Sequence, residues 1–271
     1  MPRLPLFFAL CACLFLARPG LAADPDPLAA TVISLDGDVR YDDEGVLKPV
    51  QLGQLLDVGD RVLTLENSTL HMILADGSSV VMAPNTEMTL GALGDGKPGS
   101  KTLLQVLKGL LNLMVEKQPD GFTFEVETSN AVAAVKGTDF EVNADTDDTQ
   151  VTVNEGEVHL GDPGRKRFEP IHPLERSHFH GGRLDRAMPL SKREAGEFRG
   201  RWERARMIHQ QRHELIKHFR ETGKAERKRF RQRHERRQVK HPELRKERPG
   251  QRQKERRAEK RGERRFKKKD Q

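Results

Sequence analysis

Cysteine is nearly absent from this 271-residue chain. Its two cysteines, Cys11 and Cys13, lie within residues 1–23, where one arginine precedes an apolar run and small residues follow. This arrangement is typical of a secretory signal peptide, and we expect cleavage near Ala22 or Ala23. The alternative, an uncleaved anchor, is disfavoured because an apolar run of roughly 14 residues is shorter than the ~20 that span a bilayer. The exported chain then has no cysteine, which excludes a disulfide, a thiol nucleophile and a thiolate metal ligand.

Aromatic residues and catalytic motifs are also scarce. Aromatics make up 5% of the chain and the mean hydropathy is −0.72, so a packed core cannot extend through the whole length. The exported part shows no Ser/His/Asp motif, no paired-carboxylate motif and no glycine-rich phosphate loop. We therefore expect a protein that is not an enzyme, with no catalytic residue and no cofactor.

Histidines are the main candidate metal ligands. His172, His178 and His180 cluster in one segment, while His209 and His213 lie four residues apart. The second spacing can place two imidazoles on one helical face. Neither group has a third ligand marked by its spacing, and a metal site needs a complete ligand set. We therefore expect no metal site.

Charge is divided unevenly along the chain. Residues 24–164 contain 8 Lys/Arg and 25 Asp/Glu, a net charge of −17, whereas residues 165–271 contain 38 Lys/Arg and 16 Asp/Glu, a net charge of +22. Of those 38 cationic residues, 26 are arginine, whose guanidinium forms forked hydrogen bonds to phosphate and carboxylate. An acidic part followed by a basic part predicts electrostatic association, although it does not name the partner.

Residues 28–162 show the pattern of a β domain. Short alternating stretches, such as residues 122–126 and 151–153, place apolar side chains on one face. Turn residues separate these stretches every ~8–12 residues, which is typical of an antiparallel sandwich or barrel. Residues 102–116 fit either an amphipathic helix or two strands hinged at Gly109. The all-β surroundings favour the strands.

The composition changes where the β pattern ends. Pro and Gly cluster within residues 163–190, which predicts a linker or a loop packed on the domain. Residues 191–241 are basic and carry apolar residues three or four positions apart, so we expect an amphipathic helical segment. Ser191 followed by Glu194 fits a capping box at its start. Residues 242–271 are nearly all charged, and we expect them to be disordered.

The β region carries an ordered series of short motifs. Residues 58–64 read VGDRVLT, residues 74–78 read LADGS, and residues 84–86 read PNT. The most recognisable block is AVAAVKGTDFEV at residues 131–142. Each motif is weak by itself, but the series in this order resembles the FecR domain family over residues 30–162.

The resemblance implies a jelly-roll-like β-sandwich without catalytic residues. In the best-known members, this domain lies in the periplasm behind a transmembrane helix and a cytoplasmic helical domain of an anti-sigma regulator. Here only Met1-Pro2-Arg3 precedes the apolar segment, so we expect no cytoplasmic output domain and a place in the exported, stand-alone branch of the family. Ser129 and Lys136 stand where Pro and Arg are usual, and we expect neither departure to disable the fold.

The stretch Lys136-Gly137-Thr138-Asp139 admits two interpretations. One is a threonine nucleophile with a lysine base, but no histidine or acid is placed by spacing to orient either group. The other is a bend in a core strand, where Gly137 lets the backbone turn and Thr138 forms a local hydrogen bond. We favour the bend. The motif residues that we expect to be structural are Asp76, Gly77, Gly137, Thr138 and Phe140.

The basic segment is the main candidate for a binding role. We expect anions to bind at its densest cationic run, which contains Arg227, Lys228, Arg229, Arg231, Arg233, Arg236 and Arg237. Three outcomes stay open. The segment contacts an external polyanion, such as an envelope polymer, a lipid surface or an acidic protein; or it associates with the acidic β domain; or it is a solvated helix without a partner. Export argues against nucleic acid as the partner.

These observations lead to one function hypothesis and one alternative. The first is a non-enzymatic exported binding or scaffold protein of the bacterial cell envelope, periplasmic or secreted, whose Arg-rich tail contacts an anionic surface or partner. The alternative is a periplasmic signalling or sensor component that is related to FecR-type transmembrane regulators and lacks a cytoplasmic output domain. No motif identifies the ligand, the partner or the oligomeric state.

Overall fold

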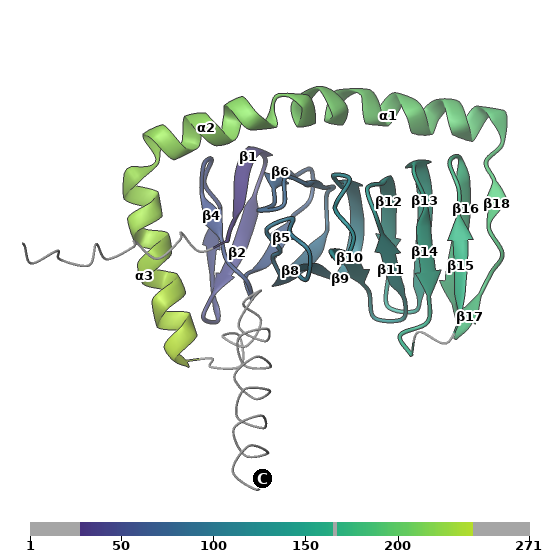
Figure 1. Cartoon of the computed structure of the whole chain (residues 1–271), viewed down its shortest axis with the longest axis horizontal. Helices are drawn as coiled ribbons and strands as arrows, with labels where there is room; N and C mark the ends of the chain where they lie inside the picture. Colours follow the sequence, from purple (N-terminus) through teal and green to yellow (C-terminus); the bar gives the residue numbers. More distant parts are fainter. Residues whose placement is uncertain (1–27, 165–166, 241–271) are drawn as a thin grey trace, which may run out of the picture.

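The computed structural model describes residues 28–164 and 167–240 (Figure 1). The strands are β1 (Ala30–Asp36), β2 (Val39–Asp43), β3 (Val46–Pro49), β4 (Leu55–Leu56), β5 (Arg61–Thr64), β6 (Thr69–Ile73), β7 (Ser79–Met82), β8 (Glu87–Ala92), β9 (Lys101–Met114), β10 (Thr123–Glu127), β11 (Val132–Val135), β12 (Asp139–Ala144), β13 (Asp148–Glu155), β14 (Val158–Gly161), β15 (Phe168–Ile171), β16 (Glu175–His180), β17 (Arg183–Leu184) and β18 (Met188–Pro189). The helices are α1 (Lys192–Gln210), α2 (Arg212–Thr222) and α3 (Lys224–Lys240). The predicted signal peptide, residues 1–23, and the predicted disordered tail, residues 242–271, lie outside the described residues.

Strand β9 joins the two halves of one connected sheet. Its first part pairs with β8 and β10, whereas its second part, from Gly109 to Met114, pairs with β7 and β12. Gly109 has a φ of 99°, and a Cβ there would lie 2.5 Å from the Cα of Thr86. The bend between the two parts therefore requires glycine. The prediction of β structure rather than a helix in residues 102–116 is confirmed, as one strand, Lys101–Met114, that bends at Gly109.

Both halves of the sheet share one hydrophobic core. The pairings give the order β3-β2-β5-β8-β9-β10-β11-β14-β15 for the first half and β4-β1-β6-β7-β9-β12-β13-β16 for the second. Val62 and Phe124 from the first half lie in the same buried cluster as Met72 and Phe140 from the second. Burial of this apolar surface is the main favourable contribution to folding. The strand-rich fold class is confirmed, and the jelly-roll-like sandwich stays a prediction.

The segment predicted as a linker, residues 163–190, contains four strands of the sheet instead. Strand β15 pairs with β14, while β16 pairs with β13, β17 and β18. Pro170 lies in β15, which pairs with β14 alone among the described strands, and such an edge position tolerates the missing N–H of proline. The Pro and Gly residues therefore mark the ends and edges of short strands, and the sheet continues to Pro189.

The first helix begins where the sequence predicts. Glu194 Oε2 accepts hydrogen bonds from the Ser191 N–H at 3.0 Å and the Ser191 hydroxyl at 2.6 Å, and the Glu194 N–H donates to Ser191 Oγ at 3.3 Å. The predicted capping box is thus present. The helical segment predicted for residues 191–241 is interrupted at Gln211 and Gly223, which separate α1, α2 and α3.

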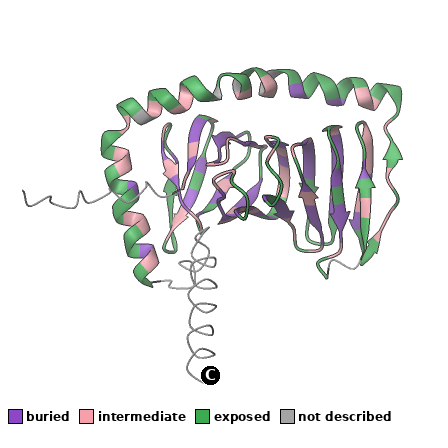
Figure 2. Ribbon diagram, in the orientation of Figure 1, coloured by how far each residue is buried: buried purple, intermediate pink, exposed green. Residues whose placement is uncertain are grey.

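The three helices form an extended strap, which we call the C-terminal strap (residues 192–240). Figure 1 shows α1 and α2 crossing the ends of the strands, from β16 and β18 towards β1, and α3 turning to pass beside β4. Helix α2 contacts β1, and α3 contacts β4. Figure 2 shows that the strap is largely exposed on its outer side, whereas the central strands are largely buried. A mostly basic element therefore lies along a mostly acidic domain.

Candidate interaction site of the C-terminal strap

The Lys136-Gly137-Thr138 step connects β11 in one half of the sheet to β12 in the other. Gly137 has a φ of 81°, and a Cβ there would lie 2.7 Å from the Cα of Lys117. Thr138 exchanges two backbone hydrogen bonds with Val115, at 3.0 and 3.1 Å, and its hydroxyl donates to the Glu157 carbonyl at 2.9 Å. Lys136 points elsewhere and pairs with Asp120 at 3.5 Å. The geometry is that of a bend, without a base beside the threonine.

Asp76 and Gly77 form the turn between β6 and β7, as the LADGS motif predicts. Gly77 has a φ of 89°. Asp76 accepts hydrogen bonds from the Ser78 N–H and from the Thr102 hydroxyl, both at 2.9 Å. Burial raises the pKa of Asp76, and these hydrogen bonds oppose the rise. Phe140, the last of the predicted structural residues, is fully buried in the core.

Helix α1 packs on the sheet through two aromatic side chains. Phe198 and Trp202 are 1% and 3% exposed, and they join Met114 of β9 in a small apolar cluster. Their rings meet edge to face with centroids 5.9 Å apart, an arrangement that aromatic pairs prefer. This contact fixes α1 to the sheet independently of charge.

Ion pairs flank the apolar contact of α1. Arg206 reaches Asp139 at 2.9 Å and Glu155 at 3.1 Å, and Arg201 reaches Glu141 at 3.4 Å. Burial raises the pKa of Asp139 and of Glu141, and the two guanidiniums oppose that rise. Asp139 belongs to the AVAAVKGTDFEV block, so the most recognisable motif of the β domain contributes an acid that receives the strap.

One histidine of α1 acts electrostatically on one histidine of the sheet. His209 Nε2 of α1 lies 3.0 Å from Glu116 Oε1. His71 of β6 is 5% exposed, and its Nε2 lies 2.5 Å from Ser79 Oγ. Burial lowers the pKa of His71 to about 4, with a further contribution from the charge of His209. His71 is therefore neutral at pH 7 in the folded protein.

Helix α3 is anchored to the loop between β4 and β5. This loop carries Asp57 and Asp60, which are 1% and 0% exposed. Arg237 donates from Nη2 to Asp60 Oδ1 at 2.7 Å and from Nη1 to the Val58 carbonyl at 2.9 Å. His234 Nδ1 lies 2.7 Å from Asp57 Oδ2. Each buried carboxylate of the loop therefore has a basic partner on α3.

A second arginine and one phenylalanine complete the contact of α3. Arg233 Nη2 donates to the Leu55 carbonyl at 2.5 Å and lies 3.5 Å from Asp60 Oδ2. Its guanidinium also lies over the Tyr41 ring, 5.4 Å from the centroid. Phe230 is 2% exposed. The inner face of α3 therefore combines apolar burial with charge-assisted hydrogen bonds.

Asp60 shows why the loop and α3 depend on each other. Burial raises the pKa of Asp60, and the charges of Arg233 and Arg237 oppose the rise. A buried carboxylate without a cation is strongly disfavoured. The ionised form of Asp60 is therefore stable in this loop only when α3 is docked. Sequence reasoning missed Asp57, Asp60, Phe230 and His234 as anchors. The VGDRVLT motif contains Asp60, but no spacing rule links it to Arg237, 177 positions away.

The seven cationic residues predicted to bind anions do not form one surface. Arg233 and Arg237 face the β domain and are engaged there. The exposed members are Lys228, Arg229, Arg231 and Arg236, and Arg227 is half-buried. Among the described side chains, none pairs with Lys228, Arg229 or Arg236, whereas Arg227 and Arg231 have contacts of their own. The cationic run thus divides into a docked set and an outward set.

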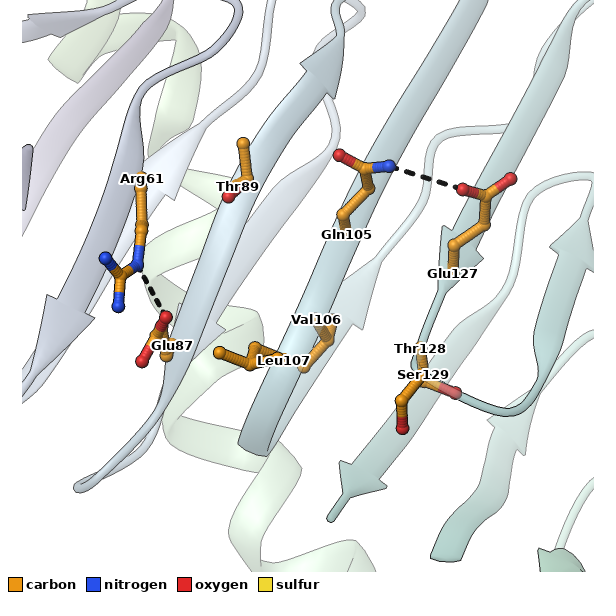
Figure 3. Close-up of a pocket in the computed structure, with 9 residues that line it drawn as sticks. All are labelled: Arg61, Glu87, Thr89, Gln105, Val106, Leu107, Glu127, Thr128 and Ser129. Carbon is orange, nitrogen blue, oxygen red and sulfur yellow. Dashed lines mark hydrogen bonds and ion pairs between the residues drawn. The ribbon is translucent and has the colours of Figure 1, made fainter. Parts of the chain in front are cut away.

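A shallow groove of 380 Å³ lies on the sheet across β8, β9 and β10 (Figure 3). Arg61 Nε donates to Glu87 Oε1 at 2.5 Å, and Gln105 Nε2 lies 3.5 Å from Glu127 Oε2. Leu107, which also lines the groove, is 54% exposed. No histidine, lysine or cysteine lines the groove; its polar lining consists of Arg61, Gln105, two glutamates and three hydroxyl residues.

Three of the five histidines considered as metal ligands face separate carboxylates. The pairs are His172 with Glu157, His178 with Asp148, and His180 with Asp185. In residues 28–164 and 167–240, no three His, Cys, Asp or Glu side chains are close enough to hold a metal ion. Within the same residues, no helix has both the length and the apolar character needed to cross a membrane.

Comparison with known proteins finds a family match and similar solved structures. A model of the family described as FecR protein matches residues 60–159. Two crystal structures of a "putative anti-sigma factor" from Parabacteroides distasonis ATCC 8503, at 1.65 and 2.50 Å resolution, each share 19% sequence identity with this chain at a TM-score of 0.43. The similarity covers 51% and 50% of this chain and 63% and 62% of those chains. No curated protein matches.

The matched region, residues 60–159, begins at Asp60, the carboxylate that anchors α3, and includes the bend at Gly137 and the acid Asp139. It contains the main motifs on which the resemblance was based, apart from the first two residues of VGDRVLT. This chain therefore contains a FecR domain, as its sequence motifs predicted.

Proposed function

We propose that this protein is a non-enzymatic binding or scaffold component of the bacterial cell envelope, periplasmic or secreted. In this proposal, a jelly-roll-like FecR sandwich holds the Arg-rich strap so that its outer side contacts an anionic surface or partner. The supporting observation is that the strap carries cations on two sides, which have different surroundings. Its inner cations pair with acids of the β domain, whereas cations on the outer side are exposed along its length.

The exposed cations come from all three helices. Examples outside the α3 face that carries Arg229 and Arg236 are Lys192 and Arg199 of α1, Lys217 of α2, and Lys224 and Lys228 of α3. No described side chain pairs with them. Since the strap is docked, these charges are held in an extended row that can contact several anionic groups at once. Each cation near an anionic membrane surface contributes about 1 kcal/mol, and added salt screens the attraction.

Sedimentation with vesicles of phosphatidylglycerol and phosphatidylcholine tests the proposal in its lipid form. The full chain should bind at low salt and dissociate as NaCl is added. The charge reversal Lys217→Glu, Lys224→Glu and Lys228→Glu should weaken binding at least about tenfold. Truncation of the strap is unsuitable, because it exposes Met114 and leaves buried acids such as Asp60 without cations.

A matched control distinguishes the effect of charges on the strap from the effect of net charge on vesicle binding. The variant Lys97→Glu, Lys117→Glu and Lys136→Glu changes the net charge equally at exposed positions of the β domain. It should retain most of the vesicle binding. Equal loss in both triple variants, or no binding by the full chain at low salt, would refute the proposed contact.

The alternative is a periplasmic sensor or signalling component, and the FecR domain itself favours it. In that case a protein partner binds the β domain, and the outer cations of the strap are not required. Capture of an envelope protein should then be equal for the full chain and for the strap charge-reversal variant. Capture that disappears with the reversal would count against this alternative.

A further inference from the structure

A second hollow lies between α3 and the β2–β3 hairpin. Its volume is 690 Å³, within the range of about 300–1,000 Å³ that is usual for small-molecule sites. The hairpin contributes Tyr41 and Val46, and the chain before β4 contributes Gln51 and Gln54. Helix α3 forms the opposite wall and is held in place by the Arg237–Asp60 pair. Two separately anchored elements therefore enclose the hollow.

Three arginines of α3 line this hollow. Arg229, Arg233 and Arg236 follow one another at steps of four and three residues, so they share one face of the helix. Arg229 and Arg236 are exposed, and no described side chain pairs with either. Arg233 is fixed through Nη2, but its buried Nε has no hydrogen-bond partner among the described residues.

The carboxylates of the lining do not pair with Arg229 or Arg236. Asp43 pairs with Lys48 at 2.8 Å, and Glu44 pairs with Lys240. Glu226 accepts a hydrogen bond from a backbone N–H of β4 at 3.3 Å. Each acid thus has another partner. Arg233 already has Asp60 as its counter-charge at 3.5 Å, so Arg229 and Arg236 are the guanidiniums of the lining with which no described carboxylate pairs.

Gln54 adds a buried donor to the lining. Its side chain belongs to a residue that is 6% exposed, and its Oε1 accepts a hydrogen bond from the Gln51 N–H at 2.9 Å. That bond fixes the orientation of the amide. The Nε2 group is left without a partner among the described residues. A buried donor of this kind is costly unless an acceptor reaches it.

We propose that this hollow is a binding site for a small polar oxyanion of sugar size, carrying a phosphate or a carboxylate. Arg229 and Arg236 pair with the anionic group through the forked geometry that guanidinium offers to both oxyanions. Gln54 Nε2 donates to a further oxygen of the ligand. The site does not depend on the proposed contact between the strap and an anionic surface, because that contact uses the neighbouring outer face of the helix.

Calorimetric titration of the full chain tests the site with three probes: glucose 6-phosphate, glucuronate and uncharged glucose. One or both anions should bind and glucose should not, and the tighter of the two identifies the oxyanion. The double substitution Arg229→Ala and Arg236→Ala should weaken binding at least about tenfold, because two charge-assisted contacts are lost. Gln54→Glu, which replaces the donor with a carboxylate, should weaken it likewise.

The control substitutes Lys224→Ala and Lys228→Ala on the same helix, with the same loss of charge outside the lining. It should change the affinity for the anion by no more than about twofold, while it lowers vesicle binding if the proposed surface contact is real. The site is overturned if neither anion binds at millimolar concentration, if glucose binds equally well, or if both double variants lose affinity to the same extent. Fluorescence of Trp202 verifies that each variant keeps α1 docked.

Discussion

Gly137 carries the turn by which the chain passes from β11 into β12. Its φ of 81° disfavours any side chain, and a Cβ would meet the Lys117 backbone at 2.7 Å. Gly137→Ala should therefore lower the free energy of unfolding by about 2 kcal/mol or more. Gly99→Ala is the matched control, because Gly99 has a φ of 83° and open space around it, so its loss should be about 1 kcal/mol. Urea unfolding measures both, and an equal loss in the two variants would contradict the close approach.

His71 makes stability depend on pH. Its pKa is lowered to about 4 by burial, against an ordinary value of about 6.5 in the unfolded chain. As the pH falls, His71 therefore binds a proton at a higher pH in the unfolded chain than in the folded protein. The contribution of His71 is fully present above about pH 6.5 and is lost towards pH 4, up to about 3 kcal/mol in total. In urea unfolding at several pH values, His71→Gln should lose less stability over this window than the wild type. Parallel curves would show that His71 does not titrate in this way.

At the scale of elements, prediction succeeded where the signal was local. The capping box of Ser191 and Glu194, the turn at Gly77 and the hinge at Gly109 each depend on residues a few positions apart. The strands β15–β18 were missed because short strands with Pro170 at an edge have the composition of a linker. Strand β16 is held by its pairing with β13. The paired residues of these strands are more than 20 positions apart, so the residues near β16 in the sequence do not reveal the pairing.

Helix α3 offers a test of docking through buried charge. Arg237→Ala removes the closer partner of Asp60, which is fully buried. The loss of unfolding free energy should be about 3 kcal/mol, since an uncompensated buried charge remains. Lys240→Ala, which removes an exposed pair with Glu44 on the same helix, should cost less than about 1 kcal/mol. Adding Asp60→Asn to Arg237→Ala should recover part of the loss. A chemical-denaturation series that finds no recovery would argue against the pair as the anchor.

At the scale of the whole molecule, the sequence shows the division into an acidic part and a basic part, but not which charges meet. The acids that pair with the strap are far apart in the sequence: Asp57 and Asp60 lie in the β4–β5 loop and meet α3, whereas Asp139 begins β12 and meets α1. Only the folded sheet places them along the C-terminal strap. The sequence did not predict the candidate small-molecule site either. It needs Gln54 and Arg236 on facing walls, and their proximity follows from the docking of α3 rather than from any spacing in the sequence.

Trp202, the single tryptophan of the chain, reports whether charge alone holds the strap. Its side chain is buried against Phe198 and Met114, and burial of apolar surface is not screened by salt. Raising NaCl to about 1 M shortens the screening length to about 3 Å, yet the emission maximum of Trp202 should stay at the short wavelength of a buried indole. A red shift to the value of the unfolded chain would mean that screened ion pairs are the main attachment. If the emission maximum does not shift, α1 stays docked at the salt concentration that dissociates the protein from vesicles. The salt dependence of vesicle binding is then caused by screening of the outer cations and not by release of this helix.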